Sequence, residues 1–534
     1  MSRTNEAPTA DGETAARPGG RRGLRGHPWL TLLTLSVGAM MVSLDGTIVT
    51  VAQPAMQADL GATLTGVQWI TNGYLLAVAA LLITAGKLGD RYGHRRLFLI
   101  GATGFTATSV AIGASGDLGW VIALRVLQGV FGALMQPATL GLLRSAFPAE
   151  RLNMPIAVRS AVIAASTAAG PVVGGLLVEH ANWSWVFYLN VPLGALSLAL
   201  GVTVLRDAPR TATAGHLDLL GMAVVGGALC AFVGGLTTLA EQGRADARTL
   251  LLLAASGVLA GLFLWWEKRA QDPLLPLRIF ASTRFTVGVL AMIAMSFVMF
   301  GAPFVLIFYL QNVLGLSPAA SGVRVLGLTL LMIVGAPPAA IWISRSGPRA
   351  PVTAGLAVTA VAMTALSRLD ADSGTLETTA CFLLLGLGFS PVMVGATKLV
   401  IGSAPAELAG VAGGVQQTSM QVGGSLGTAT VGAIVGGYVA AVLPGRLAAS
   451  GIEVPPGLGD APVRDAAVGL APDLGTRTAS AALTRIGQTT FLDGMSYALL
   501  ATAAVAALGA LAGLFAGPGK VTSSHGTTAK DPDA

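Results

Sequence analysis

The sequence predicts an all-α polytopic membrane protein, on three observations. Charged residues make up only 11% of the 534 residues, against about 25% in an ordinary globular chain. Hydrophobic residues make up 53%, and the mean hydropathy is +0.71. Soluble domains could not bury so many apolar side chains and still cover their surface with so few charged residues. The 70 glycines and 27 prolines lie within apolar runs, so they do not indicate disorder.

The apolar runs are the predicted membrane spans. A bilayer core of about 30 Å needs about 20 apolar residues per helix. Fourteen stretches meet that length: 29–53, 66–86, 97–115, 119–141, 155–178, 184–205, 217–239, 249–267, 286–310, 321–344, 351–368, 376–400, 409–443 and 494–516. The stretch 409–443 is long, and we expect one tilted helix with an extension there rather than two short helices.

Basic residues between the spans predict which side of the membrane each connection faces. If the N-terminus is inside, the even-numbered connections carry most of the lysines and arginines. The short odd-numbered connections carry only Arg244, Arg248 and Arg368. Cytoplasmic loops of membrane proteins carry an excess of Lys and Arg. We therefore expect a multi-pass protein with both termini cytoplasmic.

The same topology divides the chain into segments. Residues 1–28 and 517–534 are expected to be polar cytoplasmic tails. The apolar run after the first tail is too long for a signal peptide and lacks a cleavage site, so we interpret it as a retained span. Residues 444–493 are expected to form an external loop, because this stretch is long, of mixed charge and rich in Pro and Gly at 454–459.

The composition argues against several other classes of protein. The formal charge of +6 comes from scattered basic residues, with no basic face interleaved with aromatics, so no nucleic-acid partner is expected. Cys230 and Cys381 lie in apolar segments without a CxxC pattern, and the 5 histidines are dispersed. No disulfide framework, metal site or cofactor is therefore expected. We find no Walker A or HExxH motif and no GxSxG in a suitable setting, so an enzyme is not expected.

Asp45 is the one carboxylate that we place deep within a predicted span, 29–53. A charged group at that depth costs at least about 2.5–3.5 kcal/mol on insertion scales. Desolvation opposes the charged form, so the carboxyl group can gain or lose its proton as access from each side changes. That behaviour suits a proton-coupling site. The alternative is a structural acid that is held by hydrogen bonds to Ser43, Thr47 or another span.

Arg125 is the basic counterpart, within the predicted span 119–141. An arginine here would bias the protonation of a partner carboxylate, and Asp45 is the obvious candidate. The alternative is that Arg125 snorkels to the end of the span, which Trp120 marks.

The connection after the second span combines glycines, an acid and basic residues in a short turn. Glycine permits a tight turn and a close helix approach, and Asp90 can cap a helix and pair with a nearby arginine. Membrane topology explains the arginines, but neither the spaced glycines nor the acid. The candidate residues of this loop are Gly86, Asp90, Arg91, Gly93 and Arg95.

The predicted span 155–178 carries small residues at four-residue spacing around a proline. They are Ser166, Gly170, Pro171, Gly174 and Gly175. Small residues let helices pack closely in lipid and proline kinks a helix, so packing is one explanation of this pattern. Arg159, near the start of the span, is expected to snorkel rather than to bind substrate.

Five amide side chains within spans are candidates to line a substrate cavity, because polar groups in membrane helices usually face protein or water. They are Gln53, Asn72, Gln128, Gln417 and Gln421. Gln417 and Gln421 lie one turn apart and share a helix face. Each of the five either lines a cavity or bridges helices, and the sequence does not choose between these roles.

These segments resemble motifs of the major facilitator superfamily, and of its fourteen-span drug:proton antiporters in particular. The loop 86–96 is similar to the form G-x-L-A-D-R-x-G-R-K, and 44–54 is similar to L-D-x-T-I-V-N-V-A-L-P. Residues 125–129 match R-x-x-Q-G. Residues 166–175 resemble G-x-x-x-G-P-x-x-G-G, with Ser166 in place of the first glycine.

The resemblance implies two six-span bundles of inverted repeats, 29–205 and 286–516, with a two-span insertion in 206–285. It implies that substrate binds near the midplane between the bundles and that the loop 86–96 helps to lock the cytoplasmic gate. It also implies that Arg125 serves proton transfer. In that family, the glycine–proline motif of the fifth span marks antiporters rather than uptake symporters.

The expected function is proton-driven export of hydrophobic or amphipathic drugs or antibiotics across a bacterial cell membrane by a functional monomer. Its partners would be protons and the exported small molecule. The alternative within transporters is export of an endogenous metabolite such as a siderophore or lipid. From another class, the alternative is a membrane-embedded enzyme or sensor.

Overall fold

The computed structural model describes residues 24–148, 151–206, 218–242, 246–270, 273–405, 408–451 and 477–516. Across these residues, 14 helical segments are long and apolar enough to cross a membrane. This finding confirms the predicted all-α class with fourteen spans. Of the predicted tails, residues 1–23 and 517–534 lie outside the described residues.

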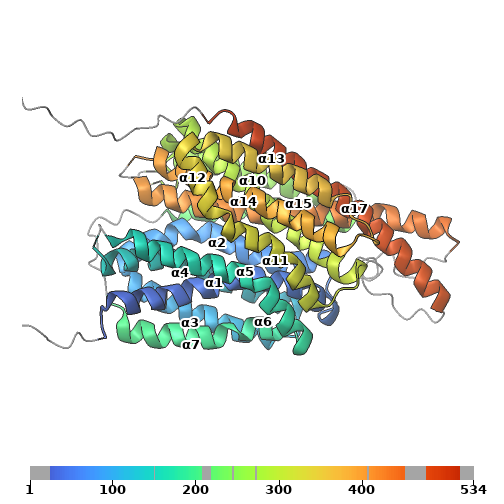
Figure 1. Ribbon diagram of the computed structural model, residues 1–534, viewed down its shortest axis with the longest axis horizontal. Coiled ribbons are helices and arrows are strands. Elements are labelled where there is room, and N and C mark those ends of the chain that lie inside the picture. Colours follow the sequence, from blue (N-terminus) through green and yellow to red (C-terminus); the bar gives the residue numbers. More distant parts are fainter. Residues whose placement is uncertain are drawn as a thin grey trace, which may run out of the picture.

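The first six spans form one group of helices, in the lower half of Figure 1. Within this group α2 packs on α4, α3 on α4, and α1 on α5. Large buried side chains such as Leu35, Met41, Phe98, Phe105 and Phe187 fill the space between them. The helices are α1 (Pro28–Asp59), α2 (Leu64–Tyr92), α3 (His94–Gly113), α4 (Leu118–Ala146), α5 (Asn153–His180), α6 (Ser184–Tyr188) and α7 (Asn190–Val204).

The last six spans form a second group, in the upper half of Figure 1. Here α10 packs on α15, and α13 packs on both α14 and α17. Phe285, Phe304, Phe308, Phe382 and Phe491 are buried within the group. Its elements are α10 (Thr283–Phe308), η3 (Tyr309–Val313), α11 (Pro318–Val334), α12 (Ala336–Ser346), α13 (Arg349–Leu366), α14 (Thr375–Ser403), α15 (Ala409–Ala449) and α17 (Arg477–Gly513).

Two further helices, α8 (Leu219–Gln242) and α9 (Ala247–Glu267), lie between the groups in the sequence. α8 packs against α9 and also against α2 and α15, one helix from each group. Only 17% of the most apolar window of α9 is buried, so this helix presents most of its surface to the lipid. A short turn of helix, η2 (Leu277–Ala281), then leads into α10.

Glycine and proline explain why one predicted span is interrupted. The predicted span 321–344 is divided into α11 and α12 at Gly335, and prolines occupy the first turn of α12. Proline has no N–H to donate, so it fits the first turn of a helix better than the interior. The predicted span 184–205 is likewise divided, at Leu189, into α6 and α7.

The predicted external loop 444–493 is helical at both of its described ends. α15 is a single helix of 41 residues that continues to Ala449, and α17 begins at Arg477. At about 1.5 Å per residue, α15 is about 60 Å long, twice the thickness of a bilayer core. Arg446 donates to Asp493 at 2.5 Å and so joins the two extensions. The residues between them, 452–476, lie outside the description.

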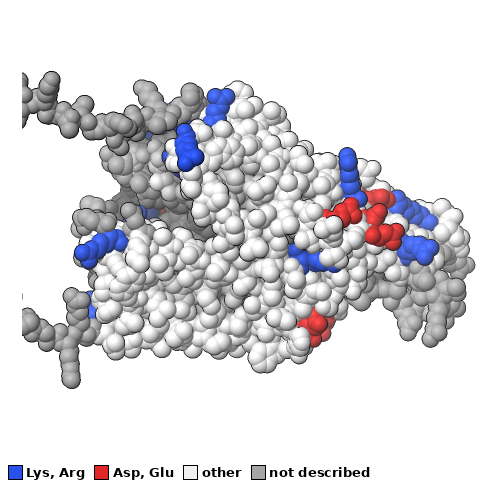
Figure 2. All heavy atoms as spheres, viewed as in Figure 1, with Lys and Arg blue, Asp and Glu red and all other residues white. Residues whose placement is uncertain are grey.

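The fourteen spans give the molecule two distinct ends. The motif end, on the left in Figure 1, holds the turn between α2 and α3. The distal end, on the right, holds the start of α4 and the projecting parts of α15 and α17. On the face drawn in Figure 2, the charged side chains at the motif end are Lys or Arg, whereas the distal end carries both signs of charge.

Candidate functional site: a buried ion pair beside a central cavity

Asp45 of α1 and Arg125 of α4 form a buried ion pair. The Arg125 Nη1 atom lies 2.6 Å from the Asp45 Oδ2 atom. The two residues are 0% and 1% exposed. Arg125 therefore does not snorkel to the end of its span. Asp45 and Arg125, the two charged residues that the sequence analysis singled out within spans, thus form an ion pair within the first group of helices.

Amide side chains complete the coordination of this carboxylate. Gln128 and Asn190 donate to Asp45 Oδ1 at 3.3 Å and 3.2 Å. The same two amides also donate to Ser109 Oγ, at 2.7 Å and 3.2 Å. With the guanidinium of Arg125, the carboxylate accepts from three donors, which is the environment that an ionised carboxylate prefers. The network joins α1, α3, α4 and α7.

Arg125 is held from several sides, so its position is well defined. Its Nε donates to the backbone oxygen of Ile70 at 3.1 Å, and its Nη1 donates to Gln128 Oε1 at 2.6 Å. Its guanidinium also lies 4.5 Å from the ring centroid of Tyr74, which is within the range of a cation–π contact. These contacts offset part of the cost of removing the charge from water.

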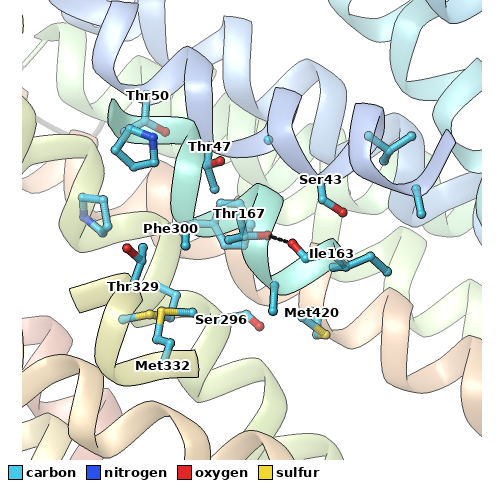
Figure 3. Close-up of a pocket in the computed structure, with 18 of the residues that line it drawn as sticks. Ser43, Thr47, Thr50, Ile163, Thr167, Ser296, Phe300, Thr329, Met332 and Met420 are labelled. Atoms are coloured by element: carbon cyan, nitrogen blue, oxygen red, sulfur yellow. Dashed lines mark hydrogen bonds between the residues drawn. The ribbon is translucent and has the colours of Figure 1, made fainter. Parts of the chain in front are cut away.

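A cavity of about 460 Å³ lies between the two groups of helices. It is lined from the first group by α1, α2, α4 and α5, and from the second by α10, α11, α14 and α15. Figure 3 shows Ser43, Thr47 and Thr50 facing it from one side. Sulfur and aromatic side chains supply much of the remaining wall: Met135, Met299, Met332, Met420, Tyr74, Phe300 and Phe389. Such a wall suits a hydrophobic guest. Thioethers make favourable contacts with aromatic rings, and the flexible methionine side chains adapt to guests of different shape.

Helix α1 presents different faces to the cavity and to the ion pair. Ser43, Thr47 and Thr50 are spaced by four and three residues, so they share one face, which lines the cavity. Asp45 lies two residues from both Ser43 and Thr47, a rotation of about 200°. Its carboxylate bonds to residues of α4 and α7 within the first group. Asp45 and Arg125 are not among the lining residues, whereas Tyr74 both lines the cavity and contacts Arg125.

The glycine–proline motif of α5 lies where that helix meets α1 and α11. A Cβ atom on Gly174 would lie 2.8 Å from Ile48 O of α1, and one on Gly175 would lie 2.8 Å from Ala319 Cα of α11. Gly170 faces Thr47 in the same way. Real Cβ atoms do not approach so closely, so these contacts require glycine. The other two motif residues, Ser166 and Pro171, lie on the same helix. Ser166 Oγ donates within α5 to Val162 O at 2.7 Å, and Pro171 lines the cavity.

Polar contacts also join the two groups on the distal side of the cavity. Glu179 accepts from the backbone N–H of Ala319 at 3.0 Å, and Gln311 donates to Val51 O at 3.1 Å. Gln68 donates to Thr428 O. These contacts close the cavity on the distal side.

The cavity extends instead toward the motif end. Gln136 and Thr139 of α4, and Arg159 and Ser160 of α5, line it close to the ends of those helices at the motif end. Figure 2 shows the surface hollowed there, between the two groups.

The loop 86–96 forms the tight turn between α2 and α3. Gly93 has φ of 98°, a conformation that favours glycine. Asp90 lies 3.1 Å from His94 Nε2 across this turn, so its partner is histidine rather than the expected arginine. The reason is local: Gly93 reverses the chain and brings His94, four residues on, over Asp90. Arg95 donates to Val202 O of α7 at 3.2 Å.

The remaining loop candidates pack locally. The Arg91 guanidinium lies 5.5 Å from the ring of Tyr92. Gly86 faces Pro137 of α4, whose Cβ would lie 3.8 Å from a Cβ added at the glycine. Lys87 donates to Pro273 O, in the segment that leads to the second group, at 3.3 Å.

Of the five amide candidates, the structure places two in the cavity and three elsewhere. Gln417 and Gln421 line it. Gln53 instead donates to Thr71 Oγ1 at 2.9 Å and joins α1 to α2, and Gln128 belongs to the Asp45 network. The side chain of Asn72 is buried and has no hydrogen-bond partner among the described residues. Helix rotation explains Gln53 and Gln128, whose side chains bond within the first group rather than face the space between the groups.

Tyr74 and Arg159 are not among the candidate cavity residues that the sequence predicts. Arg159 lines the cavity, although the sequence favours snorkelling there over substrate binding. One signal could have found the cavity face of α5: Arg159, Ile163, Thr167 and Pro171 recur at four-residue spacing, and all four line the cavity.

Comparison with known proteins agrees with this geometry. A family model described as the Major Facilitator Superfamily matches residues 35–428. The chain is 48% identical over 515 residues to the tetracenomycin C resistance and export protein of Streptomyces glaucescens, covering 96% of this chain and 95% of that protein. It is 36% identical over 422 residues to the puromycin resistance protein pur8 of Streptomyces alboniger, covering 78% and 83%.

A solved structure with a similar fold is that of a bacterial homologue of the human lysosomal transporter Spinster, in an inward-facing and unoccupied conformation. The TM-score is 0.64 at 16% identity, covering 93% of this chain and 98% of that one, so the likeness concerns the fold. The family model covers most of the chain, and the relative that aligns over nearly its whole length is named a resistance and export protein. With fourteen spans and a cavity between two groups of helices, the chain belongs to the Major Facilitator Superfamily of membrane transporters.

Proposed function

We propose that this chain is a proton-coupled antiporter that exports hydrophobic or amphipathic drug-like compounds across the bacterial cell membrane and so confers resistance. The observation that carries the proposal is the position of Tyr74. This residue lines the central cavity and also contacts the buried guanidinium that pairs with Asp45. A guest in the cavity and a proton on Asp45 therefore act on neighbouring parts of one network.

The relatives support the export of drugs. The tetracenomycin C protein is named for resistance and export, and it aligns over nearly the whole of both chains. The cavity supports the same class of compound, because its walls are largely apolar and it has the volume of a ligand site for a small molecule.

The charges support an orientation with the motif end inside the cell. On the face drawn in Figure 2, the charged side chains at the motif end are Lys or Arg, whereas at the distal end Lys and Arg are mixed with Asp and Glu. Cytoplasmic loops carry an excess of Lys and Arg. The motif end is then cytoplasmic, and so are both termini, since an even number of spans returns the chain to its starting side. In this orientation the cavity is open to the cytoplasm, the side from which an exporter collects its substrate.

The ion pair supports proton coupling. In the inward-open geometry the Asp45 carboxylate is engaged by Arg125, Gln128 and Asn190. A proton that arrives from outside neutralises the carboxylate and weakens its attraction for Arg125. The freed guanidinium then stabilises a different arrangement around Tyr74. Transport is coupled because proton and substrate bind the two states with different affinities.

The close contacts of α5 with α11 form part of the distal gate in this scheme, and the turn 86–96 belongs to the cytoplasmic gate. Opening the distal side requires the contacts of Gly175 with α11 to separate. The described cavity lining and the ion pair come from one chain, which supports a functional monomer.

Everted membrane vesicles test the proposal directly. Vesicles that contain the protein are acidified inside, and tetracenomycin C is added as the first probe. We expect substrate-dependent leakage of protons and uphill uptake of the probe. Asp45→Asn should abolish both, and Asp493→Asn is the matched control because that carboxylate pairs with Arg446 outside the network. Undiminished coupling in Asp45→Asn would refute the assigned role.

A further inference from the structure

The charge inside the cavity is strongly asymmetric. Arg159 is the one charged side chain among the residues that line the cavity in the described part of the chain, and no carboxylate lines it there. The nearest acid on α1, Asp45, is bonded to Arg125 on the other face of that helix. A guest in the cavity therefore meets one positive charge and no negative one.

Arg159 also has unused hydrogen-bonding capacity. Its side chain is half-buried, and its Nε atom is buried without a hydrogen-bond partner among the described residues. No hydrogen bond or ion pair to this guanidinium is found in that part of the chain. A buried, unpaired donor on a cation is unfavourable, and an anionic acceptor would relieve the cost.

Neutral polar groups face the same space. Gln417 and Gln421 of α15 line the cavity across from α5, and the hydroxyls of Ser43, Thr47 and Thr167 lie around it in Figure 3. The rest of the wall is apolar, sulfur-containing or aromatic. An aromatic body fits that wall, and a single acidic substituent on it fits the guanidinium.

We propose that the cavity selects compounds that carry an anionic group, a carboxylate or an ionised phenol, on a hydrophobic aromatic body, and that Arg159 binds that group. Lipophilic cations are correspondingly disfavoured. The inference rests on the proposed function, because it takes the cavity as the substrate site. It goes further in naming the charge of the substrate and the residue that recognises it.

The experiment uses three fluorescent probes that share one ring system and differ in charge. They are anthracene-2-carboxylate, anthracene-2-carboxamide and an anthracene that carries a trimethylammonium group. Binding to the purified full-length protein is followed by fluorescence anisotropy. We expect the wild type to bind the carboxylate about 10-fold more tightly than the carboxamide, since a hydrogen bond to a charged group is stronger than one to a neutral amide. The ammonium probe should bind most weakly.

Variants at Arg159 distinguish the effect of its positive charge on probe binding from the effect of its size and shape. Arg159→Gln should weaken carboxylate binding about 10-fold, leave carboxamide binding within about 2-fold and improve ammonium binding. Arg159→Lys keeps the charge and should retain most of the preference. Arg324→Gln is the matched control: Arg324 is also half-buried within a span, but it donates to Thr375 and Thr378 rather than facing the cavity.

Two results would overturn the inference. One is equal binding of the three probes by the wild type, which needs no variant to fold. The other is an equal loss for all three probes in Arg159→Gln. Failure of the proposed function looks different: in vesicles, none of the probes would drive proton leakage, whatever their order of affinity for the purified protein.

Discussion

The Asp45–Arg125 pair allows a quantitative prediction from its geometry. Asp45→Asn leaves the guanidinium of Arg125 buried without its counter-charge, at 1% exposure. Removing one partner of a buried ion pair costs about 3–5 kcal/mol. The asparagine keeps one acceptor oxygen for the guanidinium, so we expect the lower part of that range. Arg125→Gln leaves the carboxylate with the two donors Gln128 and Asn190, and we expect a similar loss of stability.

The double variant removes both charges, so no uncompensated charge stays buried. Its loss should be smaller than the sum of the two single losses by about 2–3 kcal/mol. The assay is denaturant unfolding of the purified protein in mixed micelles, which gives the free energy of unfolding for all four members of the cycle. Additive losses would refute the reasoning, because they would mean that the two side chains do not interact as the 2.6 Å contact indicates.

Three other predictions concern Tyr74 in the cavity wall, the contact of α5 with α11, and Gly93 in the turn between α2 and α3. Tyr74→Phe should preserve coupled transport, since the hydroxyl has no partner among the described residues. Tyr74→Ala should open the ion pair to the cavity and give substrate-independent proton leakage into vesicles, whereas tight vesicles would contradict the assigned wall. Gly175→Leu should wedge α5 from α11, because even a Cβ lies 2.8 Å from Ala319 Cα. Thiol labelling of Ala319→Cys in that background should then increase, and unchanged labelling would count against the gate. Gly93→Ala should lower the free energy of unfolding by about 1–3 kcal/mol, because φ is 98° there; no change would show that the turn rearranges.

The fold could be predicted from the sequence because a membrane span has a simple requirement, about 20 apolar residues. Each of the fourteen predicted stretches corresponds to a helix or a broken pair of helices. The extensions of α15 and α17 could not be predicted in this way. Beyond the bilayer, the helix at 444–449 and 477–493 is held by contacts such as Arg446 with Asp493, rather than by hydropathy.

The ion pair could be predicted in part because a charge within an apolar run is conspicuous. Asp45 and Arg125 stand out for that reason, although their contact depends on how α1 and α4 pack. The cavity was harder to predict, because its lining depends on how the two groups of helices are rotated. Gln53 and Gln417 are both glutamines within predicted spans, yet Gln53 joins α1 to α2 and Gln417 faces the cavity.

The unusual length of α15 has a mechanical consequence. The same helix lines the cavity at Gln417 and Gln421 and pairs with α17 at Arg446. From Gln421 to Arg446 the helix rises by about 37 Å, at about 1.5 Å per residue. A tilt of about 5° at the cavity therefore moves the tip by about 3 Å. The proline within α15, Pro444, lies close to that tip, so no proline kink interrupts the helix between Gln421 and Pro444. A spectroscopic label near Arg446 would thus report a tilt of α15 at the cavity through the displacement of the helix tip, far from the substrate.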